Sequence, residues 1–173
     1  VADLSLSGLL RSGGTPDVKV NGVVSQFDYN GYSFSNIDLN GTYSPQGYSG
    51  LLQIDDPNVQ ASVEGELMTA PKGQQQRINL TGAIHHFVPE ALHLSNQWGN
   101  AVFAGNIEAD ITAKTLKDAI GTLRISNFSM TEEDLQNPYH LDNLQLTSTM
   151  EQGHRNLMLV SDFVKANLQG DFE

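Results

Sequence analysis

The chain has 173 residues, a formal net charge of -11 and no cysteine. The acidic balance argues against nucleic acid and anionic membrane surfaces as partners, because binding to either depends on attraction between basic side chains and phosphates. The lack of cysteine excludes disulfides and thiolate metal sites, and no apolar run is long enough for a transmembrane helix.

The N-terminal part of the chain is predicted to form strands. Apolar residues alternate with polar ones over 4–10 and again from Val18 onward, on either side of a flexible break at 12–16. Asn30 and Gly31 form a dipeptide that is typical of a two-residue hairpin turn. We therefore expect an antiparallel hairpin whose second strand leads into residues 36–67.

The clearest pattern lies in residues 36–67. Strict alternation over 37–43, 48–54 and 59–67 is interrupted by turn sequences at 44–47 and 55–58. Period-two alternation broken by Pro, Gly, Asp and Asn clusters predicts a three-stranded antiparallel meander.

A five-residue unit, apolar-x-Gly-x-apolar, recurs along the chain. Each glycine takes a place on the apolar side of its strand, where glycine usually marks a bend, a bulge or a close approach. The repetition favours a sheet that curves along one line or leaves a hollow there, and chance recurrence of a short pattern is the alternative. The glycines are Gly8, Gly22, Gly41, Gly50, Gly65, Gly82, Gly105 and Gly170.

Two short helical insertions are expected in the second half of the chain. Pro89 followed by Glu-Ala-Leu suits the first turn of a helix, and residues 115–120 precede a stop at Gly121. Around the first insertion, an end of the apolar surface could be plugged by Phe87, Leu92, Leu94 and Trp98.

The remaining segments of the second half alternate as strands. A change of phase within one of them predicts a bulge near Asp142 and Asn143, and residues 131–134 are predicted to form an exposed acidic turn. The expected strands are 78–84, 103–111, 123–128, 139–150, 157–160 and 164–172.

No pattern of residues indicates catalysis or a cofactor. The densest cluster of metal-ligand types is His85, His86, Glu90 and His93, but it lacks the HExxH order and Pro89 interrupts it. The acidic turn at 55–58 lacks the spaced ligands of a calcium loop. Nucleophile-elbow and phosphate-loop sequences are absent, so we expect no enzyme, no metal and no cofactor.

Together these patterns predict a mainly β fold of about ten antiparallel strands. Such a sheet needs its apolar side covered, so we expect it to fold over itself into an open groove. We expect residues 1–173 to be a fragment of a longer array, with 1–86 and 101–173 as sub-units around the first insertion. The groove lining predicted from the shared phase is Val20, Val24, Leu39, Tyr43, Leu52, Ile54, Val63, Leu67, Ile78, Leu80, Ile84, Phe103, Ile107 and Ile111.

Residues 18–43, VKVNGVVSQFDYNGYSFSNIDLNGTY, resemble the repeats of TamB/AsmA-like proteins, notably those of Bacteroidota. Residues 48–67, YSGLLQIDDPNVQASVEGEL, and residues 161–172 are similar to the same family. The resemblance covers most of the chain and is weakest over 87–98.

The resemblance implies a U-shaped, taco-like sheet in the periplasm, within a protein that a segment outside these residues anchors in the inner membrane. It implies transport of phospholipid acyl chains toward the outer membrane, assembly of outer-membrane proteins with an Omp85-type partner, or both.

Two alternatives to this reading come from other classes of protein. One is a closed β-sandwich acting as a surface adhesin or glycan-binding module, whose core would be filled at native density. The other is a structural spacer without a ligand.

Overall fold

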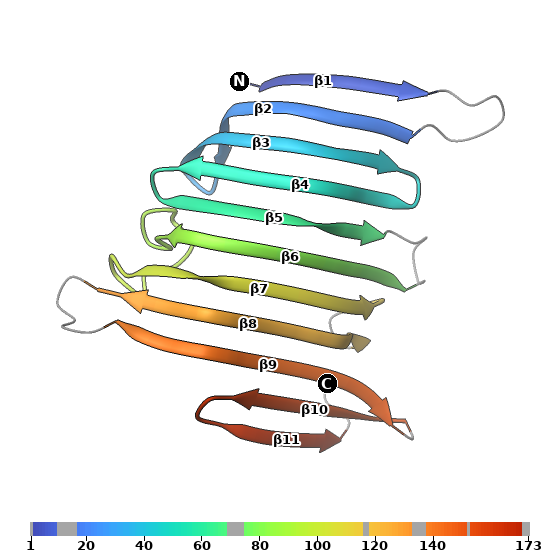
Figure 1. Ribbon diagram of the computed structural model, residues 1–173, viewed down its shortest axis with the longest axis vertical. Coiled ribbons are helices and arrows are strands. Elements are labelled where there is room, and N and C mark those ends of the chain that lie inside the picture. Colours follow the sequence, from blue (N-terminus) through green and yellow to red (C-terminus); the bar gives the residue numbers. More distant parts are fainter. Residues whose placement is uncertain are drawn as a thin grey trace.

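The computed structural model describes residues 2–9, 17–68, 75–115, 118–132, 138–151 and 153–170. They form one antiparallel sheet of 11 strands, each paired with the next along the chain (Figure 1). The prediction of a mainly β antiparallel meander is confirmed. The strands are β1 (Ala2–Leu9), β2 (Asp17–Tyr29), β3 (Tyr32–Ser44), β4 (Gly47–Asp56), β5 (Val59–Met68), β6 (Gln76–Phe87), β7 (Val102–Ala113), β8 (Ile120–Thr131), β9 (Tyr139–Glu151), β10 (His154–Ser161) and β11 (Lys165–Gly170).

The sheet is a single open layer. Every contact between described strands joins hydrogen-bonded neighbours, so none of these strands packs across the face of another. Figure 1 shows the strands stacked side by side, with β1 and β11 at opposite ends. The expected U-shaped, taco-like fold is not supported, and the described strands do not form a closed sandwich either. Each strand lies beside the one before it, so none of the described strands is carried to a second layer.

Both helical predictions are wrong for the residues that the structure describes, which contain no α-helix. At the first site the N–H groups of Leu92 and Leu94 donate to the carbonyls of Val88 (3.2 Å) and Pro89 (2.9 Å). The turn ends at His93, whose φ of 57° lies in the left-handed region. This geometry closes a helical turn and stops it from continuing.

At the second site a side chain forms the turn. The Asp118 carboxylate accepts a hydrogen bond from the Lys114 N–H (3.0 Å) and further ones from the Thr115 N–H and hydroxyl. These hydrogen bonds, the Thr115 side chain first, lower the pKa of Asp118 to about 2. Ile120 already belongs to β8. Residues 116 and 117 lie outside the described ranges, as do the expected break at 12–16 and residues 133 and 134 of the expected acidic turn at 131–134.

In β6, β7 and β8, irregular positions near segment 88–101 change which face of the sheet the following residues point to. Between β6 and β7 the register shifts between Ile84 and Phe87. Between β7 and β8 it shifts opposite Asn127, whose φ is 50°. The extra residue returns Phe128 to the side that Ile125 occupies. The β8–β9 register does not shift there, since Ile125 pairs with Leu144 and Phe128 pairs with Leu141. The change of phase predicted near Asp142 and Asn143 is therefore present on β9, beside the one on β8.

Three of the repeated glycines lie side by side. Gly41 pairs with Gly50, and Gly50 pairs with Gly65. A Cβ on Gly50 would lie 2.5 Å from the Gly41 Cα and 2.8 Å from the Tyr48 hydroxyl, and one on Gly65 would lie 2.7 Å from the Leu80 Cα. Only glycine fits so close an approach, and the Tyr48 ring covers the space that side chains would otherwise fill.

We expect Gly65→Ala to lower the free energy of unfolding by about 1–3 kcal/mol, the usual range for overpacking, because its Cβ meets main-chain atoms of β6. Glu64→Ala, at an exposed position on the same strand, should change it by less than about 0.5 kcal/mol. Urea unfolding followed by circular dichroism measures both. Equal stability of the two variants would contradict the close approach of β5 and β6.

Candidate apolar binding face

The strand registers gather the residues proposed as groove lining on one face of the sheet. Residues that are directly paired across two strands point to the same side, and Leu39 pairs with Leu52, which pairs with Val63. Applied from β2 to β7, this rule defines what we call the apolar face. It contains Val20, Val24, Leu39, Tyr43, Leu52, Ile54, Val63, Leu67, Ile78, Leu80, Ile84, Phe103, Ile107 and Ile111.

Most of the apolar face remains in contact with solvent. Tyr43 is 56% exposed and Leu67 is 41% exposed, whereas Ala109 is buried. A single layer offers no opposite wall, so the remaining apolar side chains are covered only by their neighbours on the sheet. An apolar surface of this extent is unusual for a monomeric soluble protein and usually marks an interaction site.

The segment 88–101, between β6 and β7, covers one end of the apolar face. Its Leu92 is fully buried, and the Val88 N–H donates to the Asn58 carbonyl at 3.0 Å. The Asn30 amide donates to the His93 carbonyl at 2.5 Å, and the His93 Nδ1 lies 3.3 Å from the Asn30 carbonyl oxygen. The segment is therefore fixed to both the β2–β3 turn and the β4–β5 turn.

A buried carboxylate holds those two turns together. Asp56 is 1% exposed. Its Oδ1 accepts hydrogen bonds from the Tyr32 hydroxyl (2.5 Å) and the Asn58 N–H (2.9 Å), and its Oδ2 accepts them from the N–H and hydroxyl of Ser35 (2.9 and 2.8 Å). Burial alone raises the pKa of Asp56, but these hydrogen bonds outweigh it, so the pKa lies below its ordinary value.

An apolar pocket of about 320 Å³ opens beside segment 88–101. The Trp98 ring stands edge-on to the Phe103 ring, with centroids 5.8 Å apart, and Phe103 lies against Phe128 at 6.0 Å. Of the residues predicted at this end, Leu92 is fully buried, whereas Leu94 is 48% exposed and Trp98 is 47% exposed. The pocket is lined by Ile84, Phe87, Pro89, Trp98, Phe103, Ala104, Gly105, Asn106, Ile107, Ile125 and Phe128.

Sequence reasoning missed Pro89, Ile125 and Phe128 as lining residues. The signal for Phe128 was the phase change on β8, which places it beside Ile125. The prediction identified the matching change on β9 but not the one on β8, so the two residues were not brought together.

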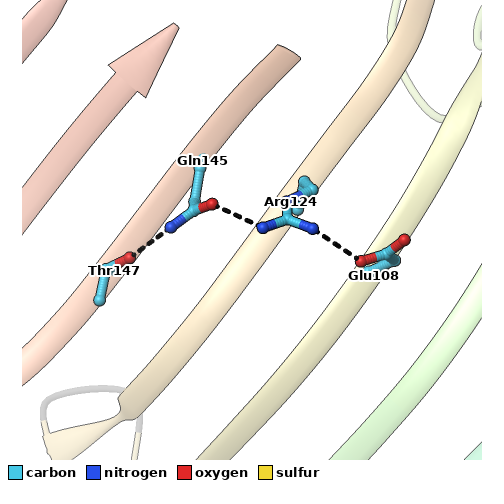
Figure 2. Close-up of polar contacts among 4 residues, drawn as sticks. All are labelled: Glu108, Arg124, Gln145 and Thr147. Carbon is cyan, nitrogen blue, oxygen red and sulfur yellow. Dashed lines mark hydrogen bonds and ion pairs between the residues drawn. The ribbon is translucent and has the colours of Figure 1, made fainter.

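The opposite face of the sheet is polar. Figure 2 shows Arg124 donating to Glu108 (3.3 Å) and to Gln145 (2.9 Å), which in turn donates to Thr147 (3.2 Å). These side chains come from three adjacent strands. The charged groups are about half exposed, where an ion pair contributes about 0–1 kcal/mol. These hydrogen-bonded side chains therefore identify the water-facing side of the sheet and contribute little to its stability.

A large hollow also lies on the polar side. Its volume is about 1110 Å³, and it is lined by polar side chains such as Lys19, Asn40, Thr42 and Glu64 together with the row of glycines. The glycine pattern suggested a hollow on the apolar side. The structure instead opens it to the polar side, because Tyr48 occupies the apolar side of the row.

The histidines and acids between residues 85 and 93 do not form a metal centre in the structure. Among the described residues, no group of three or more His, Asp or Glu side chains is placed to hold one metal ion. His93 instead packs edge-on against Tyr32, with ring centroids 6.2 Å apart, and so helps to fix segment 88–101.

No protein-family model, curated protein or solved structure matches the chain. The described residues contain no helix that is long and apolar enough to cross a membrane. The geometry of the apolar face is therefore the main guide to function.

Asp56→Asn should lower the free energy of unfolding at neutral pH by about 1–3 kcal/mol, because an amide replaces a charged acceptor of four hydrogen bonds. The pKa of Asp56 is lowered in the folded protein, so its contribution is complete above the ordinary aspartate pKa of about 3.9 and is lost as the pH falls through the lower folded value. The stabilities of wild type and variant should therefore converge below about pH 4.

Urea unfolding at a series of pH values measures this convergence. Asp38→Asn, on the exposed polar side, serves as the control and should follow the wild type more closely at neutral pH. A wild-type advantage over Asp56→Asn that stays constant from neutral to acidic pH would contradict the role given to the carboxylate.

Proposed function

We propose that the chain is a periplasmic segment of a TamB/AsmA-like envelope protein, and that its apolar face carries phospholipid acyl chains between the inner and outer membranes. The observation that carries the proposal is the continuous apolar face of a one-layer sheet, which no other described strand covers. A surface of this kind needs an apolar partner, and an acyl chain provides one without requiring a specific shape.

The energetics of an acyl chain suit such a face. Each buried CH₂ group contributes about 0.8 kcal/mol, so a chain lying across several strands gains enough to leave water. Neighbouring aliphatic side chains such as Leu39, Leu52 and Val63 offer similar surroundings, so the chain can move in small steps. The headgroup stays in water, and we expect weak headgroup selectivity.

The resemblance of residues 18–43 and 48–67 to TamB/AsmA-like repeats supports this choice of ligand. The same proposal includes an inner-membrane anchor outside these residues and an Omp85-type partner, through which the protein would also support assembly of outer-membrane proteins. In the whole protein the sheet would curve over into a U-shaped groove, with the described strands as part of its wall. No catalytic step is included, because a conduit needs an apolar surface and no reactive group.

Two adjacent leucines give a matched test. Leu52 lies on the apolar face, opposite Leu39, and Leu51 lies on the polar face, opposite Asn40. We expect Leu52→Asp to fold but to stop crosslinking to a phospholipid with a photoreactive acyl chain, because the new carboxylate reaches water across an open sheet and interrupts the apolar path. Leu51→Asp should crosslink as the wild type does, and Ile107→Asp should behave as Leu52→Asp does.

Circular dichroism checks folding before the crosslinking assay. Wild-type crosslinking by a folded Leu52→Asp protein would exclude a role for the face in lipid binding. Unfolding of Leu52→Asp alone would show that the face is buried against another layer of protein, because an unpaired charge is then placed in a dry interior.

A further inference from the structure

We propose that the pocket beside Trp98 seats the methyl end of one acyl chain, and that segment 88–101 is a fixed end-stop for the apolar face. This inference rests on the proposed function and refines it. A uniform face would let an acyl chain slide in either direction. An apolar pocket bounded on one side by segment 88–101 gives the bound chain a direction, with its methyl end beside Trp98 and its headgroup away from it.

The chemistry of the pocket selects hydrocarbon. Of its lining residues, only Asn106 and Trp98, through its indole N–H, have polar side-chain atoms. Asn106 pairs with Ser126, next to the pair of Ile107 with Ile125, so its side chain points to the polar face and only its backbone lines the pocket. No lining residue is ionisable, so the pocket offers no charged side chain to pair with a phosphate or an ammonium group.

The size of the pocket selects the end of a chain. Its 320 Å³ is roughly twice the volume of the apolar cavity, about 150 Å³, that holds one benzene ring. It therefore has room for a short hydrocarbon segment but not for a headgroup with its acyl chains. The pocket shares Ile84 and Ile107 with the apolar face, so a chain lying on the face continues into it without crossing polar groups.

The wall of the pocket is held in place. Leu92 and Ala101 of segment 88–101 are both 0% exposed. The paired contacts of Asn30 with His93, the residue after Leu92, fix this part of the segment to the β2–β3 turn. Pro89 is buried, and the Trp98 ring, although 47% exposed, rests edge-on against Phe103, so the two residues form the wall of the pocket on the side of segment 88–101. This gives a role to the part of the chain that resembles TamB/AsmA-like repeats least.

The chain has one tryptophan, so the fluorescence of Trp98 reports on the pocket directly. The probe is lysophosphatidylcholine, used below its micelle-forming concentration, with a nitroxide quencher either next to the methyl end or next to the headgroup. We expect a loss of Trp98 fluorescence with the methyl-end label and little change with the headgroup-end label. Equal quenching by the two labels, or stronger quenching by the headgroup-end label, would overturn the inference.

A matched pair of variants tests whether the pocket is responsible. Ile84→Phe adds volume to the pocket wall. Ile120→Phe makes the same change on the polar side, since Ile120 pairs with Thr112, which pairs with Arg77. In Ile84→Phe the two labels should quench Trp98 fluorescence equally, although the variant should still bind the probe. In Ile120→Phe the methyl-end label should still quench more strongly than the headgroup-end label. An unchanged difference in folded Ile84→Phe would overturn the assignment to this pocket.

Binding of the unlabelled probe, measured by calorimetry, distinguishes failure of the end-stop from failure of the proposed lipid-carrying function. Binding without a difference between the labels overturns only the end-stop and leaves the lipid-carrying face in place. No binding of the probe to the wild-type protein overturns both.

Discussion

The one-layer fold depends on the connections between strands, each of which brings the chain back antiparallel to the strand before it. Each turn places a strand beside the strand that it has just left, so 11 strands add edge to edge in sequence order. Antiparallel sheets usually bury one face on a second layer. Here alternation produces an apolar face and the topology supplies no layer to cover it. The few fully buried side chains, such as Leu92 and Ala101, lie where segment 88–101 provides local cover.

Special backbone positions shape this one-layer sheet. The glycine row of Gly41, Gly50 and Gly65 lets β3, β4 and β5 approach closely while Tyr48 covers the gap. At the other end of the strands, Asn36 and Asn127 adopt positive φ values of 50°. At Asn127 the extra residue returns an aromatic side chain to the apolar face. The pocket beside Trp98 depends on this change of phase, because regular alternation would turn Phe128 toward the polar side.

The sequence was sufficient for the local features of the fold and insufficient for the features that depend on distant residues. Alternation placed Leu39, Leu52 and Ile107 on one face, because strand periodicity is a local property. Pro89 suggested a short helix, but the chain forms only a turn there, because Leu92 and His93 dock on remote hairpins. The Asp56 turn looked like an ordinary solvated turn, since Tyr32, which hydrogen-bonds its carboxylate, is 24 residues away. Curvature of the whole sheet likewise has no local signature.

The central claim is that the apolar face is covered by lipid in its working state. The most direct test is native mass spectrometry, with lipid extraction, on protein expressed in a diderm bacterium and purified without detergent. The account predicts a protein that carries phospholipid of mixed headgroups and releases it on mild activation. Lipid-free protein, either as a stable monomer or as a dimer that buries the apolar face between two copies, would contradict it.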